Sequence, residues 1–412
     1  MGTKSSKLAT VSIEEGPNWL DLPADILDII IQKVAVSVVD SIRFGAVCRL
    51  WWKAMCTMIS SSPSSSLISS PSPWLMFTAI RKKKINPDPR EEVQNSCSCF
   101  GIEERYETYR FNNMPRNYIH SVRGSTRGWL VFYNEVRNLY IFNPCSRVQI
   151  LLPPFRKVFE SRAAVVTKAI LLSDPSRTGN WRIVVSSPHR APSLEGLAIY
   201  KHGNQNNNNN SASDPCWTGF GHQNYQDMIL HNDEKLYALS LTDLGLGSVE
   251  VWDVHDDSKL PTKVASFTNT ADVDTSYIHT PFQFYVYKVD YTGKKWEKLE
   301  NLGDRILFLS ESNQASMSIS ARNCSRLQAN SIYFVRRPGY GAEVLVYSLE
   351  KKVAKRIPVE PPDDMKATCW IVPNPTLSAD MEHKPTSKPK RLVFPFAISC
   401  FIRLGANQNS SN

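Results

Sequence analysis

The side chains that most often perform chemistry in proteins, histidine and cysteine, are scattered along this chain of 412 residues. None of the eight histidines belongs to an HExxH or HxH pattern, so the sequence predicts no histidine-based metal site. Cys97-Ser98-Cys99 is the only close pair among the nine cysteines, and no CxxC motif or Cys/His quartet of the kind that binds structural zinc is found. We therefore expect neither a metal nor a cofactor.

Motifs for other kinds of catalytic site are also missing from the sequence. It contains no GxSxG nucleophile elbow and no Walker loop, and Gly339-Tyr340-Gly341 falls between two predicted strands, where a turn is the simplest use. Asp253, Asp256 and Asp257 crowd one loop, but a calcium loop needs further oxygen ligands and a glycine in register. Catalytic groups can be distant in sequence, yet nothing here indicates an enzyme.

Loop residues offer another kind of function, the binding of a protein. Aromatic and arginine side chains on loops are frequent anchors of protein interfaces. Arg336, Arg337 and Tyr340, between two predicted strands, are candidates for such anchors, although exposed residues of these types are commonly just solvated. The substrate or partner that they would bind is unknown from the sequence.

The charge pattern bounds the possible partners. The chain has 48 Lys and Arg against 39 Asp and Glu, a net charge of +9, and the excess is scattered. Two basic runs, at 81–84 and 384–391, are typical of solvated linkers, with nuclear targeting or phosphate binding as alternatives. A scattered charge argues against a nucleic-acid partner.

Targeting signals give few constraints. No apolar run reaches the roughly 18–20 residues of a membrane span, so we expect none. No signal-peptide pattern is found, so we expect a reducing compartment, the nucleus or the cytoplasm or both, with free thiols. Residues 1–6 fit the N-myristoylation pattern, a short match that leaves modification of Gly2 open.

The segment at 22–34 predicts a helix with an apolar surface. Pro23 suits a first helical turn, and Asp21 and Asp25 complement the positive end of the helix dipole. Leu27 and Ile31 widen the apolar stripe until most of the circumference is hydrophobic. The stripe itself consists of Leu22, Ile26, Ile29, Ile30 and Val34 at helical spacing.

A second helix is expected after Asp40-Ser41, a plausible N-cap. Gly45 should weaken it by roughly 1 kcal/mol. Its apolar residues are Phe44, Val47, Trp51, Met55 and Met58, with Leu50 and Trp52 beside them. These forty or so residues carry more apolar surface than two or three short helices can bury, so they either pack on the rest of the chain or bind another protein.

The same segment resembles an F-box over residues 19–58. The resemblance is carried by Leu22-Pro23-x-x-Ile26-Leu27-x-x-Ile30 and Val47-Cys48-Arg49-x-Trp51-Trp52. It departs from the usual pattern at Ala24, at Gly45-Ala46 and at Trp52. An F-box docks on a Skp-type adaptor and through it on a cullin-based ubiquitin ligase. The resemblance therefore implies a set of adaptor-binding residues: Leu22, Pro23, Ile26, Leu27, Ile30, Val47, Cys48, Trp51 and Trp52.

Beyond the serine-rich stretch at 60–66, short β-branched and aromatic runs alternate with turn residues, which predicts strands. Three copies of a strand, turn, strand, polar turn, strand pattern occur at 128–153, 235–265 and 331–358, with partial copies at 181–201 and 284–296. Repeats of this kind favour a β-propeller over an irregular β-sandwich, with five to seven blades at roughly forty residues each.

This larger part resembles the plant F-box proteins whose C-terminal domain is a KIB-type β-propeller. The resemblance runs over residues 73–372, and its most distinctive element is Leu302-Gly303-Asp304-Arg305. One departure is the polar, Thr-rich stretch at 262–281, where we expect a short or irregular blade. Further carrying motifs are Pro73-Trp74-Leu75-Met76, Gly124-Ser125-x-x-Gly128-Trp129-Leu130, Asn143-Pro144, Asp227-Met228-Ile229-Leu230, Tyr287-Lys288-Val289-Asp290 and Asn330-Ser331-Ile332-Tyr333-Phe334.

The sequence thus predicts a mainly β protein with a small all-α F-box. The expected division is a disordered N-terminus at 1–17, F-box helices at 18–59, a Ser/Pro-rich linker at 60–72, a propeller at 73–373 and a basic or polar segment at 374–412, with one strand candidate at 392–404. The resemblance implies a non-catalytic adaptor subunit of a Skp-cullin-F-box ligase that presents an unknown protein substrate. The alternatives are a propeller scaffold with a degenerate F-box and a basic nucleic-acid-binding protein.

Overall fold

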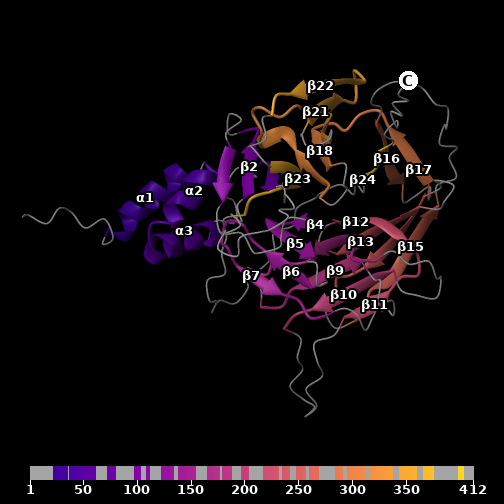
Figure 1. Cartoon of the computed structure of the whole chain (residues 1–412), viewed down its shortest axis with the longest axis horizontal. Coiled ribbons are helices and arrows are strands. Elements are labelled where there is room, and N and C mark those ends of the chain that lie inside the picture. Colours follow the sequence, from indigo (N-terminus) through magenta and orange to yellow (C-terminus); the bar gives the residue numbers. More distant parts are fainter. Residues whose placement is uncertain are drawn as a thin grey trace, which may run out of the picture. The chain divides into compact units, whose positions relative to one another are not determined.

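The chain divides into two compact units, Met1–Ser69 and Ser70–Asn412. Three helices make up the first unit, and strands dominate the second (Figure 1). A computed structural model describes residues 22–35, 37–61, 72–79, 97–103, 108–111, 122–133, 138–154, 165–176, 179–187, 196–203, 217–231, 234–241, 247–256, 259–268, 284–290, 295–310, 315–336, 343–359, 365–374 and 398–402.

The helical unit consists of α1 (Ala24–Val34), α2 (Val38–Gly45) and α3 (Arg49–Ser61). Pro23 precedes α1, and its carbonyl accepts the N–H groups of Ile26 and Leu27 at 3.1 Å. A proline here leaves no backbone donor unsatisfied, because it has no N–H to place.

The prediction of one long second helix after Asp40-Ser41 is wrong. The Ser37 hydroxyl accepts the Asp40 N–H at 3.2 Å and starts α2 three residues earlier. A new helix then begins after Cys48, whose Sγ accepts the Trp51 N–H at 3.4 Å. Two caps within a dozen residues therefore split the segment into α2 and α3.

The strands that the structure describes in the second unit form six sheets, five with four or five strands and one with three. The first sheet has the order β23 (Met365–Ile371), β1 (Trp74–Ala79), β2 (Cys97–Gly101), β3 (Thr108–Phe111), and the second has the order β4 (Val122–Thr126), β5 (Trp129–Tyr133), β6 (Leu139–Phe142), β7 (Gln149–Leu151). The third sheet has the order β8 (Lys168–Leu171), β9 (Arg182–Ser186), β10 (Leu197–Lys201), β11 (Thr218–Phe220), and the fourth has the order β12 (Tyr225–His231), β13 (Lys235–Leu241), β14 (Gly247–Asp253), β15 (Thr262–Thr268). The fifth sheet has the order β24 (Ile398–Ile402), β16 (Phe284–Asp290), β17 (Lys295–Leu299), and the sixth has the order β19 (Met317–Ser320), β18 (Arg305–Ser310), β20 (Ser331–Arg336), β21 (Glu343–Ser348), β22 (Val353–Ile357).

Shared hydrophobic cores, and the proximity of β23 to β4, join each described sheet to the next around a ring, which makes the unit a β-propeller. On β9, Ile183 and Val185 join the hydrophobic core shared with the preceding sheet, whereas Val184 joins the core shared with the following one. Alternate residues of a strand point to opposite faces, so a fully apolar strand can serve two cores. Similar cores join the later sheets to one another and the last sheet to the first. The predicted fold class is confirmed, and a two-layer sandwich is excluded.

The two ends of the propeller are joined within one sheet. β23 pairs antiparallel with β1, with Leu75 opposite Trp370. The hydroxyls of Thr78 and Thr368 lie 2.7 Å apart in the same sheet. This pairing joins strands almost 300 residues apart. It closes the ring, because β23 becomes an edge strand of the sheet that contains β1, β2 and β3 (Figure 1).

The predicted repeats are all found as strands. The three full copies are β5–β7, β13–β15 and β20–β22, and the partial copies are β9–β10 and β16–β17. The strand candidate at 392–404 contains β24, which pairs with β16. The Thr-rich stretch begins with β15, the outer strand of its sheet, and residues 269–283 lie outside the described residues.

Candidate functional site

Helix α1 has a buried face and an exposed apolar face. Leu27 and Ile31 are almost fully buried and pack with Phe44 and Met55 in the core of the helical unit. At 3.6 residues per turn, Ile26 and Ile29 lie roughly 150° around the axis from that pair. Their side chains are 44% and 52% exposed. The apolar residues of α1 therefore divide into two sets: Leu27 and Ile31 pack in the core, and Ile26 and Ile29 lie on the surface.

The nine predicted adaptor-binding residues fall into three groups. Leu27, at 2% exposed, belongs to the core and offers no surface to a partner. Pro23, Ile26 and Val47 are exposed. The other five, which are partly buried, are Leu22, Ile30, Cys48, Trp51 and Trp52.

The α2–α3 junction holds several predicted residues in structural roles. Cys48 caps α3 as described above, and the Trp51 ring stacks on Phe44 with centroids 4.6 Å apart. A Cβ added to Gly45 would lie 2.3 Å from Cε3 of Trp52. Gly45 and Trp52, two departures from the usual F-box pattern, therefore compensate one another, because the tryptophan ring occupies the space that the glycine leaves.

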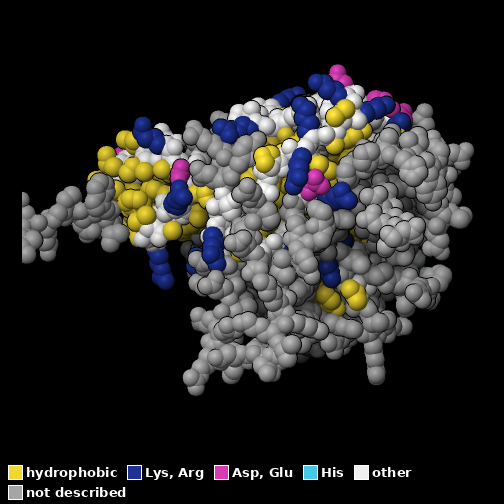
Figure 2. All heavy atoms as spheres, turned by 45° about the horizontal axis from the view of Figure 1, so that its top comes forward, with side chains coloured by type: hydrophobic (Ala, Val, Ile, Leu, Met, Phe, Trp, Pro, Cys, Tyr) yellow, Lys and Arg dark blue, Asp and Glu magenta, His cyan; other side chains and the backbone are white. Residues whose placement is uncertain are grey.

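Four aliphatic side chains of the helical unit are about half exposed, and we refer to them together as the exposed helical face: Ile26, Ile29, Val47 and Leu50. Val47 and Leu50 are 51% and 54% exposed. Figure 2 shows hydrophobic side chains gathered over the helical unit. Ile29 and Leu50 are not among the nine residues that the F-box resemblance implies. Ile29 is identified by its position opposite the Leu27–Ile31 pair on α1, and Leu50 by its exposure in the first turn of α3. A surface of this composition suits a protein partner and no covalent chemistry.

Two thiols of the propeller, Cys99 and Cys145, are poor nucleophiles. A hydrogen bond to Cys97, followed by burial, raises the pKa of the Cys99 thiol well above its usual range. Burial raises the pKa of Cys145 to about 12. Such thiols stay protonated at neutral pH and are weak nucleophiles. Among the residues that the structure describes, no group of three or more His, Cys, Asp or Glu side chains could hold a metal ion.

The family motifs in the propeller build joints between strands. Asp304 Oδ2 accepts from Ser320 Oγ and from Arg322 Nε, both at 2.8 Å, and so fastens β18 to the end of β19. Hydrogen bonding to Ser320 is the largest cause that lowers the pKa of Asp304. Trp129 Nε1 donates to Asp174 Oδ1 at 2.9 Å, and Asn374 Nδ2 donates to Asp174 Oδ2 at 3.2 Å. In these two motifs, Asp304 and Trp129 therefore join segments of the propeller that are distant in sequence.

The predicted loop anchors are mostly untested by the structure. Arg336 ends β20 and its guanidinium lies 3.8 Å from the Glu343 carboxylate. Arg337 and Tyr340 lie outside the described residues. On the face in Figure 2, Lys and Arg side chains lie apart from one another and beside Asp and Glu in places. No helix in the described ranges is both long and apolar enough to cross a membrane.

Comparison with known proteins identifies both parts of the chain. The family model of the KIB1-4 beta-propeller matches residues 99–348, more than half of the chain. The Arabidopsis thaliana protein named Probable F-box protein At4g22165 is 25% identical, over 79% of this chain and 87% of that protein. F-box protein At2g05970 of Arabidopsis thaliana is 24% identical, over 87% of this chain and 96% of that protein.

One solved structure that matches, the complex of KlAtg21 with the coiled coil of AgAtg16, has a TM-score of 0.29 and 10% identity, over 68% of this chain and 80% of that one. A likeness this weak carries no argument, so the fold assignment rests on the sheets and on the family match. A helical unit with F-box motifs precedes a propeller that the family model matches, and full-length relatives are named F-box proteins. The chain belongs to the plant F-box proteins that carry a KIB1-4-type β-propeller.

Proposed function

We propose that this protein is the substrate-recruiting subunit of a Skp-cullin-F-box ubiquitin ligase, docking on the Skp-type adaptor through the exposed helical face. The single observation that carries the proposal is the exposure of Ile26, Ile29, Val47 and Leu50 in so small a unit. Because these side chains are already about half buried, burying the rest of one in an interface is worth about 0.7–1.5 kcal/mol, and the four together can supply the core of a contact.

In this role the protein performs no bond chemistry of its own. Ubiquitin transfer belongs to other subunits, and the propeller raises the effective concentration of a bound protein near the charged conjugating enzyme. The joints built by the family motifs support a rigid scaffold, on which loops can vary without changing the fold. We infer that the protein acts in the nucleus, the cytoplasm or both.

Pull-down with a Skp-type adaptor tests the docking. Ile26→Asp with Ile29→Asp should lower adaptor affinity by at least about 100-fold, because two charges would have to be desolvated in an apolar interface. The matched control is Leu260→Asp with Val264→Asp, two exposed aliphatic residues of the propeller, which should leave adaptor binding unchanged. Circular dichroism should show the same helix content in both variants.

A core substitution shows how loss of folding would differ from loss of docking. Leu27→Ala removes a core side chain and should cost about 2–5 kcal/mol of stability, so any loss of adaptor binding there would come with loss of helix. If the Ile26 and Ile29 variant binds the adaptor as the native chain does, docking through this face is refuted. A native chain that recovers neither adaptor nor cullin would favour a scaffold with a degenerate F-box.

A further inference from the structure

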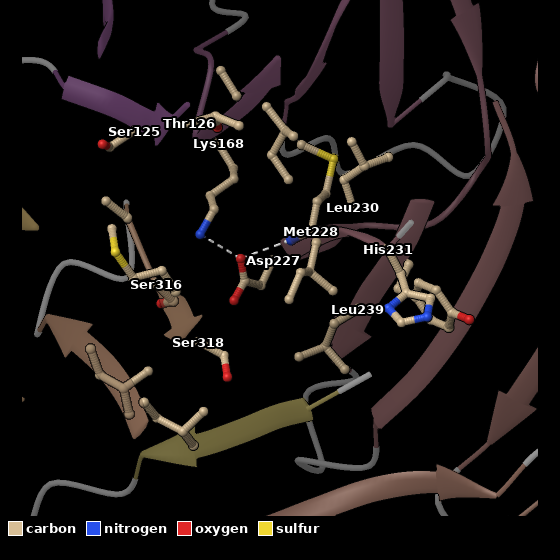
Figure 3. A pocket seen from close by; sticks show the side chains of 18 of the residues that line it. Ser125, Thr126, Lys168, Asp227, Met228, Leu230, His231, Leu239, Ser316 and Ser318 are labelled. Carbon is tan, nitrogen blue, oxygen red and sulfur yellow. Dashed lines mark hydrogen bonds and ion pairs between the residues drawn. The ribbon is translucent and has the colours of Figure 1, made fainter. Parts of the chain in front are cut away.

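The inner strands of the propeller surround a cavity of about 320 Å³ (Figure 3). Its lining comes mainly from β4, β8, β12, β18 and β19, which belong to four different sheets. The volume lies within the range of about 300–1,000 Å³ that is typical of small-molecule sites.

A buried ion pair crosses this cavity between two sheets. Lys168 on β8 has a side chain only 5% exposed, and its Nζ lies 2.6 Å from Asp227 Oδ1 on β12 (Figure 3). The same oxygen accepts the Met228 N–H at 2.8 Å. The pair fixes an ammonium beside a carboxylate on the inner strands, because removing one partner of a buried ion pair is strongly destabilising.

The lining carries more positive than negative charge. Among the described residues that line the cavity, the cations are Arg127, Lys168 and Arg305, and Asp227 is the only carboxylate. Arg305 Nε donates to the Ser318 hydroxyl at 3.1 Å, and the carboxylate of Asp304, next to it in the chain and outside the lining, balances part of the guanidinium charge. Burial and the positive charge of Arg305 lower the pKa of His231, so this imidazole is neutral at pH 7.

Two polar atoms of the lining lack a protein partner. Ser125 Oγ and His231 Nε2 are buried and form no hydrogen bond within the described part of the chain. Groups of this kind lower the stability of the empty protein and favour a ligand that can pair with them.

The rest of the lining is aliphatic. Leu230 and Leu239 project beside Met228 on one side of the ion pair in Figure 3, and Leu307 and Leu309 of β18 add further apolar surface. Such a cavity combines a few convergent polar groups with an apolar wall, which is the usual composition of a small-molecule site.

We propose that the central cavity binds a small organic anion, a carboxylate or phosphate head joined to an apolar body. The head pairs with Arg305 and with the ammonium of Lys168, and the body packs on the aliphatic wall. The site lies entirely within the propeller unit, so the proposal does not depend on the docking of the helical unit.

Calorimetric titration of the full-length protein tests the head and body separately. Benzoate and phenyl phosphate supply both parts, benzamide replaces the carboxylate by a neutral group of the same shape, and inorganic phosphate has no apolar body. Saturable binding of benzoate or phenyl phosphate, at least about tenfold tighter than that of benzamide and inorganic phosphate, is expected. The tighter of the two aromatic anions identifies the head. Equal binding of benzoate and benzamide, or no saturable binding of either anion, overturns the proposal.

Arg305→Gln keeps a hydrogen-bond donor near Ser318 and removes the charge, so it should weaken anion binding at least about tenfold. The matched control is Arg356→Gln, on the outer strand β22, where the side chain is 69% exposed and pairs with Glu343 at 3.5 Å. Anion affinity should not change in the control. Equal affinities of the two variants contradict the assignment of Arg305.

Photolabelling of the native protein keeps the proposal testable if Arg305→Gln fails to fold. Irradiation with 4-azidobenzoate should label peptides that contain residues 125–127, 168–170, 227–231 or 305–318, and excess benzoate should suppress the label. Label confined to other peptides, or label that benzoate does not suppress, overturns the proposal.

Discussion

Replacing Gly45 by alanine should destabilise the helical unit, although alanine is the better helix former. The added Cβ would lie 2.3 Å from Cε3 and 2.6 Å from Cζ3 of Trp52, whereas ordinary contacts begin at 3.4 Å. It would also lie 3.2 Å from Cε of Met55, so the ring cannot move freely toward that side chain. Relief of the overlap requires the partly exposed ring of Trp52 to shift by roughly 1 Å, which costs about 1–3 kcal/mol.

The opposing gain is smaller. Gly→Ala at a compatible backbone position stabilises a protein by about 0.4–1 kcal/mol, mostly through the unfolded chain. The net expectation for Gly45→Ala is therefore a destabilisation of about 1 kcal/mol. With Trp52→Ala already in place the overlap disappears, and the same substitution should become stabilising by about 0.4–1 kcal/mol. The change of sign distinguishes a steric pair from two independent sites.

Hydrogen exchange of the full-length chain, read by mass spectrometry at the amides of α2 and α3, measures these opening free energies. Gly179→Ala is the control, because nothing lies within 4 Å of the Cβ that it adds. It should change local stability by less than about 0.5 kcal/mol. If Gly45→Ala increases protection in the native background, or has the same effect with and without Trp52, the compensation argument is refuted.

Three further outcomes test the propeller. Gly124→Ala should lower its melting temperature sharply, because the added Cβ would lie 1.9 Å from the backbone oxygen of Ala169 on the neighbouring inner strand. Glu103→Ala should cost about 2–4 kcal/mol in urea unfolding, since its two carboxylate oxygens accept three backbone N–H groups and one hydroxyl from the loop at 325–327; Glu103→Gln should cost less. The folded-state pKa of Asp304 is lowered, first by Ser320, so its stabilisation is present above the unfolded pKa of about 3.9 and is lost as the pH falls through the folded value. Melting temperatures between pH 6 and pH 2 should therefore fall less for Asp304→Asn than for the native chain, and an equal fall would contradict this assignment.

Local patterns in the sequence were sufficient for the strands and for the family. In β5–β7 and β13–β15, β-branched and aromatic runs end at turn residues within a few positions, and both triplets form as predicted. The F-box motifs lie within forty residues and mark the helical unit in the same way. Such patterns need no distant contact, because strand and helix periodicity are properties of neighbouring residues.

The division of α1 into two faces was not predictable from spacing alone. Ile26, Leu27, Ile29 and Ile31 are chemically alike, and only the positions of Phe44 and Met55 decide which of them are buried. The error in the second helix has a similar origin. Ser37 is an ordinary capping residue, but so is Asp40, and cysteine is not among the preferred caps, so the sequence did not indicate the hydrogen bonds by which Ser37 and Cys48 begin α2 and α3.

A helical unit with F-box motifs and a set of repeated strands could be predicted from sequence, because periodicity and turn chemistry depend on adjacent residues. The closure of the ring by β23 on β1, and the meeting of Lys168, Asp227 and Arg305 in one cavity, became visible only in the folded chain. Those three residues come from three separate sheets. Their proximity depends on how the sheets pack around the propeller axis. That packing buries side chains from distant segments against one another, so no single stretch of the chain encodes it.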